Sequence, residues 1–208
     1  VDEFDITVKG KGGHAASPHL AIDPVVISAQ VISAVQTIIS RSTDPVDKAL
    51  ISITKINAGT AYNVIDDQVK MGGTIRTFRR ETRAYIEKRL NELCKGIADA
   101  HGAEIKIEFD LVNKYPPTIN SKEETKFAAN VAKDLVGDDK VITDIDPSMG
   151  GEDFSYLLEK KPGSYLYLGQ GDEEHSAHLH TTKYDFNDNL LPIGVNFWVD
   201  LVQKYFSK

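Results

Sequence analysis

The chain has 208 residues, of which 41% are hydrophobic and 26% are charged, with a formal net charge of -7 at pH 7. These values are typical of a globular protein with one large or two small domains. The acidic balance without a basic cluster excludes nucleic acid as a partner, and no apolar run approaches the length that spans a membrane. No signal peptide is recognised, and the single cysteine, Cys94, excludes an internal disulfide and favours a reducing, cytoplasmic location.

The first half of the chain predicts four strands and two helices. Apolar and polar residues alternate in the strands, and apolar residues recur at helical spacing in the helices. Asp23 and Pro24 are suited to begin the first helix, and Gly102 is placed to end the second. The strands are expected over 4–8, 50–56, 69–75 and 105–111, and the helices over 24–39 and 81–101. The order βαββαβ predicts a ferredoxin-like fold of the α/β (α+β) class, with both helices on one face of the sheet.

The second half predicts a partial α/β layer. The segment Tyr115-Pro116-Pro117-Thr118 marks a boundary, which gives domains over residues 1–116 and 117–208. Ile193, Phe197, Leu201 and Tyr205 are expected to form the buried stripe of the last helix. Helices are expected over 123–135, 151–159 and 191–205, and short strands over 141–143 and 164–168. Because these elements are too few for an independent core, we expect further sheet from missing sequence or from another chain.

A glycine-rich turn leads to the first candidate for chemistry, His14. Gly10, Gly12 and Gly13 let the backbone turn and approach a partner closely. His14 follows the first predicted strand, where an imidazole can act as a proton donor or a hydrogen-bond donor to a substrate. The glycine spacing does not match a phosphate-binding loop. The alternative is an ordinary turn histidine in water.

Three histidines near the C-terminus form the second candidate. His175, His178 and His180 lie within six residues, and imidazoles at this spacing can supply ligands to a transition metal from a loop. A self-contained zinc site needs a fourth ligand or an open water position. A solvated polar loop and a free-standing zinc protein built on the three histidines remain alternatives.

The remaining candidates carry groups that bind anions or carbonyls. The guanidinium of Arg76 presents a planar fork suited to a carboxylate, and the Asn63 amide can donate to a carbonyl or an oxyanion. Gly151 and Glu152 lie at the predicted start of helix 151–159, where free backbone amides favour an anionic group. The alternatives are a surface arginine, a turn asparagine and acids that complement the helix dipole.

In combination these segments resemble the dinuclear-metal amidohydrolases that include aminoacylases, hippurate hydrolases, indoleacetyl-amino-acid hydrolases and N-acetyl-diaminopimelate deacetylases. The matching segments occur in the family's order over nearly the whole chain: Gly10-Lys11-Gly12-Gly13-His14-Ala15-Ala16, Ile22-Asp23-Pro24-Val25-Val26, Asn57-Ala58-Gly59-Thr60-Ala61-Tyr62-Asn63-Val64-Ile65, Gly72-Gly73-Thr74-Ile75-Arg76, Gly151-Glu152-Asp153-Phe154-Ser155, and His180 with Tyr184 and Leu191-Pro192. Asp66 departs from the proline that usually follows Asn-Val-Ile in the family.

The resemblance implies a role for each part of the chain. Residues 1–116 would be the family's lid or dimerisation domain, and 117–208 the C-terminal portion of its metal-dependent catalytic domain. His14 would reach into the active site of a partner subunit and stabilise the tetrahedral intermediate. Arg76 would hold a substrate carboxylate, with Asn63 nearby, and His180 would be the last metal ligand. We also assign Gly151 and Glu152 to substrate binding.

The implied activity is metal-dependent hydrolysis of the amide bond of N-acyl amino acids by a homodimer that forms through the lid. The implied cofactors are two divalent ions of zinc, manganese, cobalt or nickel. In this family the other metal ligands and the general-base glutamate lie upstream of the lid, so we expect this chain to be a fragment with at most a partial metal site. The alternative left open is a non-enzymatic ferredoxin-like module that dimerises or binds amino acids.

Overall fold

The computed structural model describes residues 1–110 and 114–207, and their contacts divide the chain into two compact units. The N-terminal unit contains Val1–Pro117 together with Ser148–Asp153, and the C-terminal unit contains Thr118–Pro147 and Phe154–Lys208. We call Ser148–Asp153 the strap, because it belongs to the N-terminal unit while the residues on both sides of it belong to the other.

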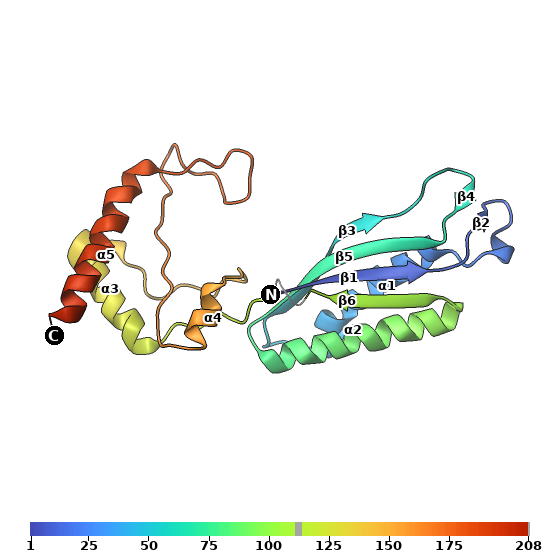
Figure 1. The fold of residues 1–208 in the computed structure, drawn as a ribbon, viewed down its shortest axis with the longest axis horizontal. Coiled ribbons are helices and arrows are strands. Elements are labelled where there is room, and N and C mark those ends of the chain that lie inside the picture. The colour runs from blue at the N-terminus through green and yellow to red at the C-terminus, as the bar shows by residue number, and fades with distance from the viewer. Residues whose placement is uncertain (111–113, 208) are drawn as a thin grey trace. The chain divides into compact units, whose positions relative to one another are not determined.

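A four-stranded antiparallel sheet forms the N-terminal unit. Its strands are β1 (Asp2–Lys9), β3 (Ala49–Asn57), β5 (Gln68–Thr77) and β6 (Glu104–Phe109), in the order β3-β5-β1-β6. Helices α1 (Pro24–Thr37) and α2 (Arg80–His101) pack on one face of this sheet (Figure 1). This topology confirms the predicted ferredoxin-like fold. Leu111, predicted to end the last strand, lies outside the described residues.

Local sequence signals account for the two helices. The Asp23 carboxylate accepts hydrogen bonds from the backbone amides of Val25 and Val26 at 2.8 and 3.4 Å, so it caps the start of α1 as predicted. Gly102 ends α2 in the left-handed conformation, with φ of 65°, which favours glycine because it has no Cβ.

The core lies between the sheet and the two helices. Alternate residues of β1 are buried, which is the pattern expected of a strand with one face against a core. The apolar side chains of α1 and α2 complete the same cluster. Its fully buried members with the largest side chains include Ile6, Ile27, Ile38, Met71, Ile75, Ile86 and Leu90.

Helix α1 continues into a π-helical turn, Ile38–Ser42, and this changes one expectation. Pro24–Ser42 is 19 residues long and, by length and composition alone, apolar enough to cross a membrane. The expectation that no apolar run approaches such a length was wrong. The helix is this apolar because one of its sides supplies Ile27, Val31 and Val35 to the core. A single helix of this kind near the N-terminus is weak support for a membrane span, because a helix buried in a protein core can have the same length and composition.

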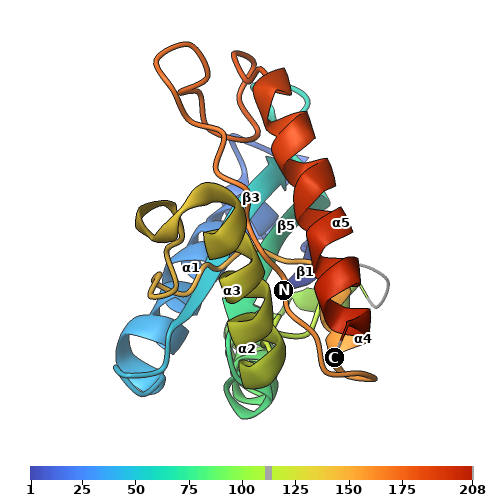
Figure 2. The same ribbon diagram turned by 90° about the vertical axis from the view of Figure 1, so that its left-hand side faces the viewer.

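Helices make up the regular structure of the C-terminal unit. They are α3 (Lys122–Val136), α4 (Phe154–Leu158) and α5 (Leu191–Phe206), with short 3₁₀ turns at Asp138–Lys140 and Asp188–Leu190. Figures 1 and 2 show α3 and α5 side by side. Their contact includes the rings of Phe127 and Tyr205, whose centroids are 6.1 Å apart, and the Lys204–Asp134 ion pair.

Four predictions for this unit were wrong. No strand forms over 141–143 or 164–168 in the described residues, because a strand needs a neighbour for its backbone N–H and C=O groups and this unit offers none there. The helix predicted over 151–159 begins only at Phe154, so Gly151 does not lie at a helix start. The expected stripe of α5 is not fully buried: Tyr205 is 60% exposed.

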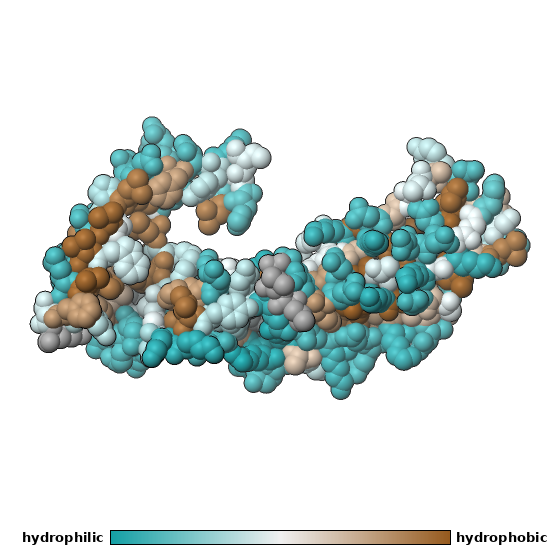
Figure 3. Space-filling model, viewed as in Figure 1, coloured by the Kyte–Doolittle hydropathy of each residue, from teal (hydrophilic) through white to brown (hydrophobic). Residues whose placement is uncertain are grey.

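The C-terminal unit instead exposes much of its apolar surface. Figure 3 shows apolar side chains at the surface along α5. Exposed members on this helix are Leu191, Val195, Trp198, Val199, Val202 and Phe206. A large exposed apolar patch is typical of a surface that another segment or chain covers.

Candidate functional site

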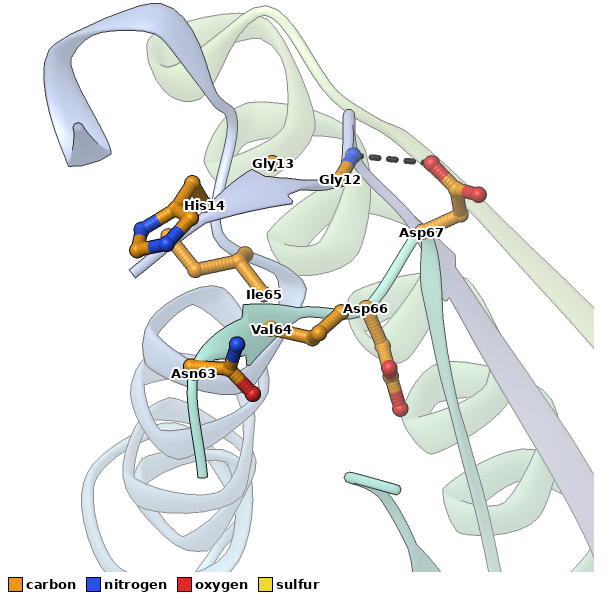
Figure 4. Close-up of a pocket in the computed structure, with 8 residues that line it drawn as sticks. All are labelled: Gly12, Gly13, His14, Asn63, Val64, Ile65, Asp66 and Asp67. Atoms are coloured by element: carbon orange, nitrogen blue, oxygen red, sulfur yellow. Dashed lines mark hydrogen bonds between the residues drawn. The ribbon is translucent and has the colours of Figure 1, made fainter. Parts of the chain in front are cut away.

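A small two-stranded ribbon carries His14 at one end of the N-terminal unit. Strand β2 (Gly13–His14) pairs antiparallel with β4 (Val64–Ile65), so that His14 lies opposite Val64. The backbone amide of Ala15 donates to the carbonyl of Asn63 at 3.0 Å and extends this pairing. The ribbon therefore fixes His14 and Asn63 on adjacent segments that are far apart in the sequence (Figure 4).

The glycines before His14 are required by close backbone approach. A Cβ on Gly10 would lie 2.0 Å from the carbonyl oxygen of Ile22, and one on Gly12 would lie 2.8 Å from the carbonyl oxygen of Ile65. The Gly12 amide also donates to the Asp67 carboxylate at 2.8 Å. The predicted close approach is therefore present. The glycines approach the backbone of the same chain, at Ile22 and Ile65.

The imidazole of His14 is exposed and has one defined partner. Its Nδ1 lies 3.0 Å from the backbone amide of Ala16, which donates to it. A ring nitrogen that accepts a hydrogen bond carries no proton, so the neutral imidazole has its proton on Nε2. His14 therefore offers an Nε2–H donor.

An open hollow of about 490 Å³ lies beside His14. It is lined by Gly12, Gly13, His14 and the run from Asn63 to Asp67. Figure 4 shows His14 and Asn63 toward one end of the paired segments and Asp66 and Asp67 toward the other. Asp66 accepts a hydrogen bond from the Thr60 hydroxyl at 3.1 Å and so closes the loop that carries Asn63.

Arg76 lies near the far end of β5 from this ribbon. Gln68, beside the ribbon, and Arg76 are eight positions apart in β5, which at ~3.3 Å per residue is about 26 Å. The Nη1 of Arg76 donates to the carbonyl oxygen of Met149 in the strap at 2.8 Å. The structure thus brings Arg76 together with the segment that carries Gly151 and Glu152, and it does not bring Arg76 together with His14 or Asn63.

The strap contains neither a helix nor a strand. A Cβ on Gly151 would lie 2.7 Å from the Val1 side chain, so glycine allows the strap to lie close to the start of β1. Glu152 is half-buried. The contact between Arg76 and Met149 could not be predicted from the sequence, because the acceptor is a backbone carbonyl and every residue has one.

The three histidines near the C-terminus do not converge. The Nδ1 of His175 lies 2.8 Å from the Asp172 carboxylate, which also accepts the His175 backbone amide at 2.7 Å. The Asp172 carboxylate raises the pKa of His175 through the side-chain hydrogen bond, and the backbone amide of His175 is the main cause of the lowered pKa of Asp172. His178 and His180 are exposed, and His180 has φ of 63°.

The residues that the structure describes contain no group of three or more His, Cys, Asp or Glu side chains that could hold a metal ion. A metal pair therefore does not fit the described residues alone. The free-standing zinc protein considered above is not supported for the same reason.

Comparison with known proteins decides the family. Residues 7–204 match the model of Peptidase family M20/M25/M40. The chain belongs to this family. Among M20 relatives it is 38% identical to the hippurate hydrolase of Campylobacter jejuni, over 99% of this chain and 52% of that protein. It is 35% identical to the IAA-amino acid hydrolase ILR1-like 2 of Arabidopsis thaliana, over 99% of this chain and 47% of that protein.

Solved M20 structures agree with the sequence comparison. The YXEP protein of Bacillus subtilis, described as a dinuclear metal binding peptidase from the M20 family, superposes with a TM-score of 0.70. The two chains are 29% identical, over 96% of this chain and 48% of YXEP. This M20 chain thus spans about half the length of the relatives it matches. Membership of the family does not favour the non-enzymatic amino-acid-binding module.

Proposed function

We propose that this chain contributes to the metal-dependent hydrolysis of the amide bond of N-acyl amino acids. Its N-terminal unit is the lid and dimerisation domain, and its C-terminal unit is the C-terminal portion of the catalytic domain. Support comes from two amide hydrolases of amino-acid conjugates, the hippurate hydrolase and the IAA-amino acid hydrolase, at 38% and 35% identity. The exposed apolar face of α5 supports a catalytic domain that further polypeptide completes.

The separation of His14 from Arg76 carries the proposal. Because the two positions are about 26 Å apart along β5, His14 and Arg76 of one lid cannot both contact one small substrate. A homodimer resolves this if His14 of one subunit acts in the site that contains Arg76 of the other. Such an arrangement is a natural outcome of two-fold symmetry, in which each subunit gives and receives the same residue.

The edges of the sheet favour β3 as the dimer contact. β6, at one edge, carries the exposed charges Glu104, Lys106 and Glu108, which discourage pairing with another strand. β3, at the other edge, ends in an exposed stretch that includes Ile56 at 55% exposure. Val25 and Val26 on α1 are exposed as well. We assign the partner on this surface to a second copy of the chain.

Each proposed site residue has a chemical task that its geometry supports. The Nε2–H of His14 donates to the oxyanion of the tetrahedral intermediate, an interaction worth ~3 kcal/mol for one well-placed donor. The Asn63 amide donates beside it. The Arg76 guanidinium binds the substrate carboxylate and so sets the position of the scissile amide. Gly151 and Glu152 line the same subsite on the strap.

Two divalent ions, of zinc, manganese, cobalt or nickel, are the proposed cofactors, with His180 as one ligand. Because the described residues lack a converging ligand set, we assign the other ligands and the general base to residues outside them. The buried thiol of the single Cys94 supports a reducing location, which we take to be the cytoplasm.

Hydrolysis of hippurate and N-acetyl amino acids, with added manganese or zinc, tests the proposal. We expect no cleavage by the 208-residue chain alone and metal-dependent cleavage by a longer form that supplies the remaining ligands. Cleavage by this chain alone would contradict our assignment of the metal ligands. A metal-loaded longer form that binds free amino acids in a calorimeter and cleaves no N-acyl amino acid would contradict the function itself.

A further inference from the structure

An arginine that also belongs to the proposed substrate site joins the strap to the N-terminal unit. Its six residues cluster with the lid sheet, although the residues before and after them cluster with the C-terminal unit. Within this unit, Arg76 Nη1 donates to the Met149 carbonyl at 2.8 Å, across 73 positions of sequence. The strap is therefore tied to a strand that is remote from it in the chain.

The base of this contact is rigid. Arg76 lies in β5, where it pairs with Leu50 of β3, and the neighbouring Ile75 is fully buried and pairs with Asp2 of β1. A hydrogen bond from a guanidinium is stronger than one between neutral groups. Partial burial also protects it from screening by salt. This bond can hold the strap even when no substrate is present.

The Met149 carbonyl uses only part of the guanidinium. Arginine has five N–H donors in a planar fork, and the contact with Met149 occupies Nη1. Donors thus remain for a carboxylate. We propose that Arg76 has two roles: it anchors the strap through the Met149 carbonyl, and its remaining donors bind the substrate carboxylate. The second role rests on the proposed function, and the first does not.

This arrangement makes Arg76 a positioning residue for Gly151 and Glu152. These two residues lie two and three positions after Met149, so the side chain that would bind the carboxylate also sets where they lie. Loss of Arg76 then affects a substrate that has no carboxylate, because the strap is loosened in either case. A residue that only bound the carboxylate would leave such a substrate unaffected.

Limited proteolysis of the 208-residue chain tests the anchor without substrate, metal or partner. A glutamate-specific protease cuts after Glu152 in the strap and after Glu174 in an exposed loop, which serves as the reference. We expect Arg76→Gln to raise the rate of cleavage at Glu152 relative to Glu174 by about tenfold, the effect of one lost hydrogen bond to a charged group. An unchanged ratio would overturn the anchor.

Two controls exclude general effects. Arg79→Gln removes a nearby arginine that pairs with Asp47 at 2.8 Å, and it should change the ratio by no more than about twofold. Cleavage after Glu92, within α2, reports unfolding of the whole unit. If Arg76→Gln exposes Glu92, Arg76→Met replaces it in the test, because methionine keeps a long unbranched side chain and has no N–H donor. We then expect the same rise in the ratio of cleavage at Glu152 to cleavage at Glu174, and a wild-type ratio would overturn the anchor.

Kinetics of an active form of the protein tests the combination of the two roles. We expect Arg76→Gln to lower kcat/KM for hippurate and also to lower kcat for hippuramide, which has no carboxylate, by about tenfold. Unchanged kcat for hippuramide would overturn the dual role. If no form of the protein hydrolyses hippurate, the proposed function fails, and the proteolysis result still decides whether Arg76 anchors the strap.

Discussion

His14 lies in the two-stranded ribbon beside the start of β5, and Arg76 lies near the other end of this strand, about 26 Å further along it. His14 is fixed by the ribbon beside the start of β5, and Arg76 by strand pairing near its end. Both positions are set by backbone hydrogen bonds, so side-chain motion cannot bring the two groups together. A site that uses both residues on one small substrate therefore needs two copies of the lid.

The first prediction concerns the proton on His14. Because the Ala16 amide donates to Nδ1 at 3.0 Å, the neutral ring should carry its proton on Nε2. Long-range ¹⁵N–¹H NMR spectra of the chain above pH 8 report the tautomer of each histidine directly. A spectrum in which His14 is the Nδ1–H tautomer would contradict the donor role that we assign to Nε2.

The second prediction compares two glycines. Gly10→Ala places a methyl group 2.0 Å from the Ile22 carbonyl oxygen, so it should lower the free energy of unfolding by about 1–3 kcal/mol. Gly96→Ala, in α2 with open space around it, should raise the free energy of unfolding by about 0.5–1 kcal/mol. Urea denaturation measures both values. Equal stability of the two variants would show that Gly10 and Ile22 do not approach as described.

The third prediction concerns Cys94 in the core of the N-terminal unit. Burial raises the pKa of its thiol from 9.0 to about 11. The thiolate is the reactive form, so at pH 8 the native chain should react with a disulfide reagent at least about 100-fold more slowly than the urea-unfolded chain. Equal rates would mean that Cys94 is accessible, and the packing of α2 on the sheet would have to be revised.

The fourth prediction concerns pH and the Asp172–His175 pair. Since the Asp172 carboxylate raises the pKa of His175, the charged imidazole stabilises the loop below its unfolded pKa, and this stabilisation is lost as pH rises through the folded value. The pKa of Asp172 is lowered, so its contribution is lost as pH falls through its folded value. Asp172→Asn should lower the pKa of His175 in an NMR titration. An unchanged His175 titration would contradict the pair.

The N-terminal unit could be predicted from the sequence because its signals are local. Alternation in β1, the cap at Asp23 and the glycine at 102 each act over a few residues and agree with one another. The two-residue strands β2 and β4 were missed, because pairs this short have no periodicity of their own. They form only when the chain brings His14 and Val64 together.

The C-terminal unit could be predicted only in part, because its signals depend on partners. The residues of 164–168 have the composition of a strand, but a strand forms only beside another one, and the described residues supply none. The burial of α5 also depends on partners. Its residues are apolar on more than one side, and α3 covers only one of these sides in the described structure. The contact between Arg76 and Met149 had no signal, since any residue offers a backbone carbonyl.

The exchange of His14 between subunits is the central claim, and it is first tested by single variants. In an active form of the protein, His14→Ala should lower kcat by about 100-fold, which corresponds to ~3 kcal/mol of lost transition-state stabilisation, and should change KM little. Arg76→Ala should be similarly inactive at low substrate. These two variants then serve as partners for the decisive measurement.

That measurement is the hippurate hydrolysis rate of His14→Ala and Arg76→Ala subunits after they are unfolded, mixed in equal amounts and refolded together. Half of the dimers are then mixed, and each mixed dimer has one site with both residues intact, so we predict recovery of about a quarter of the wild-type rate. A mixture no more active than its separate components would contradict a site shared between two subunits.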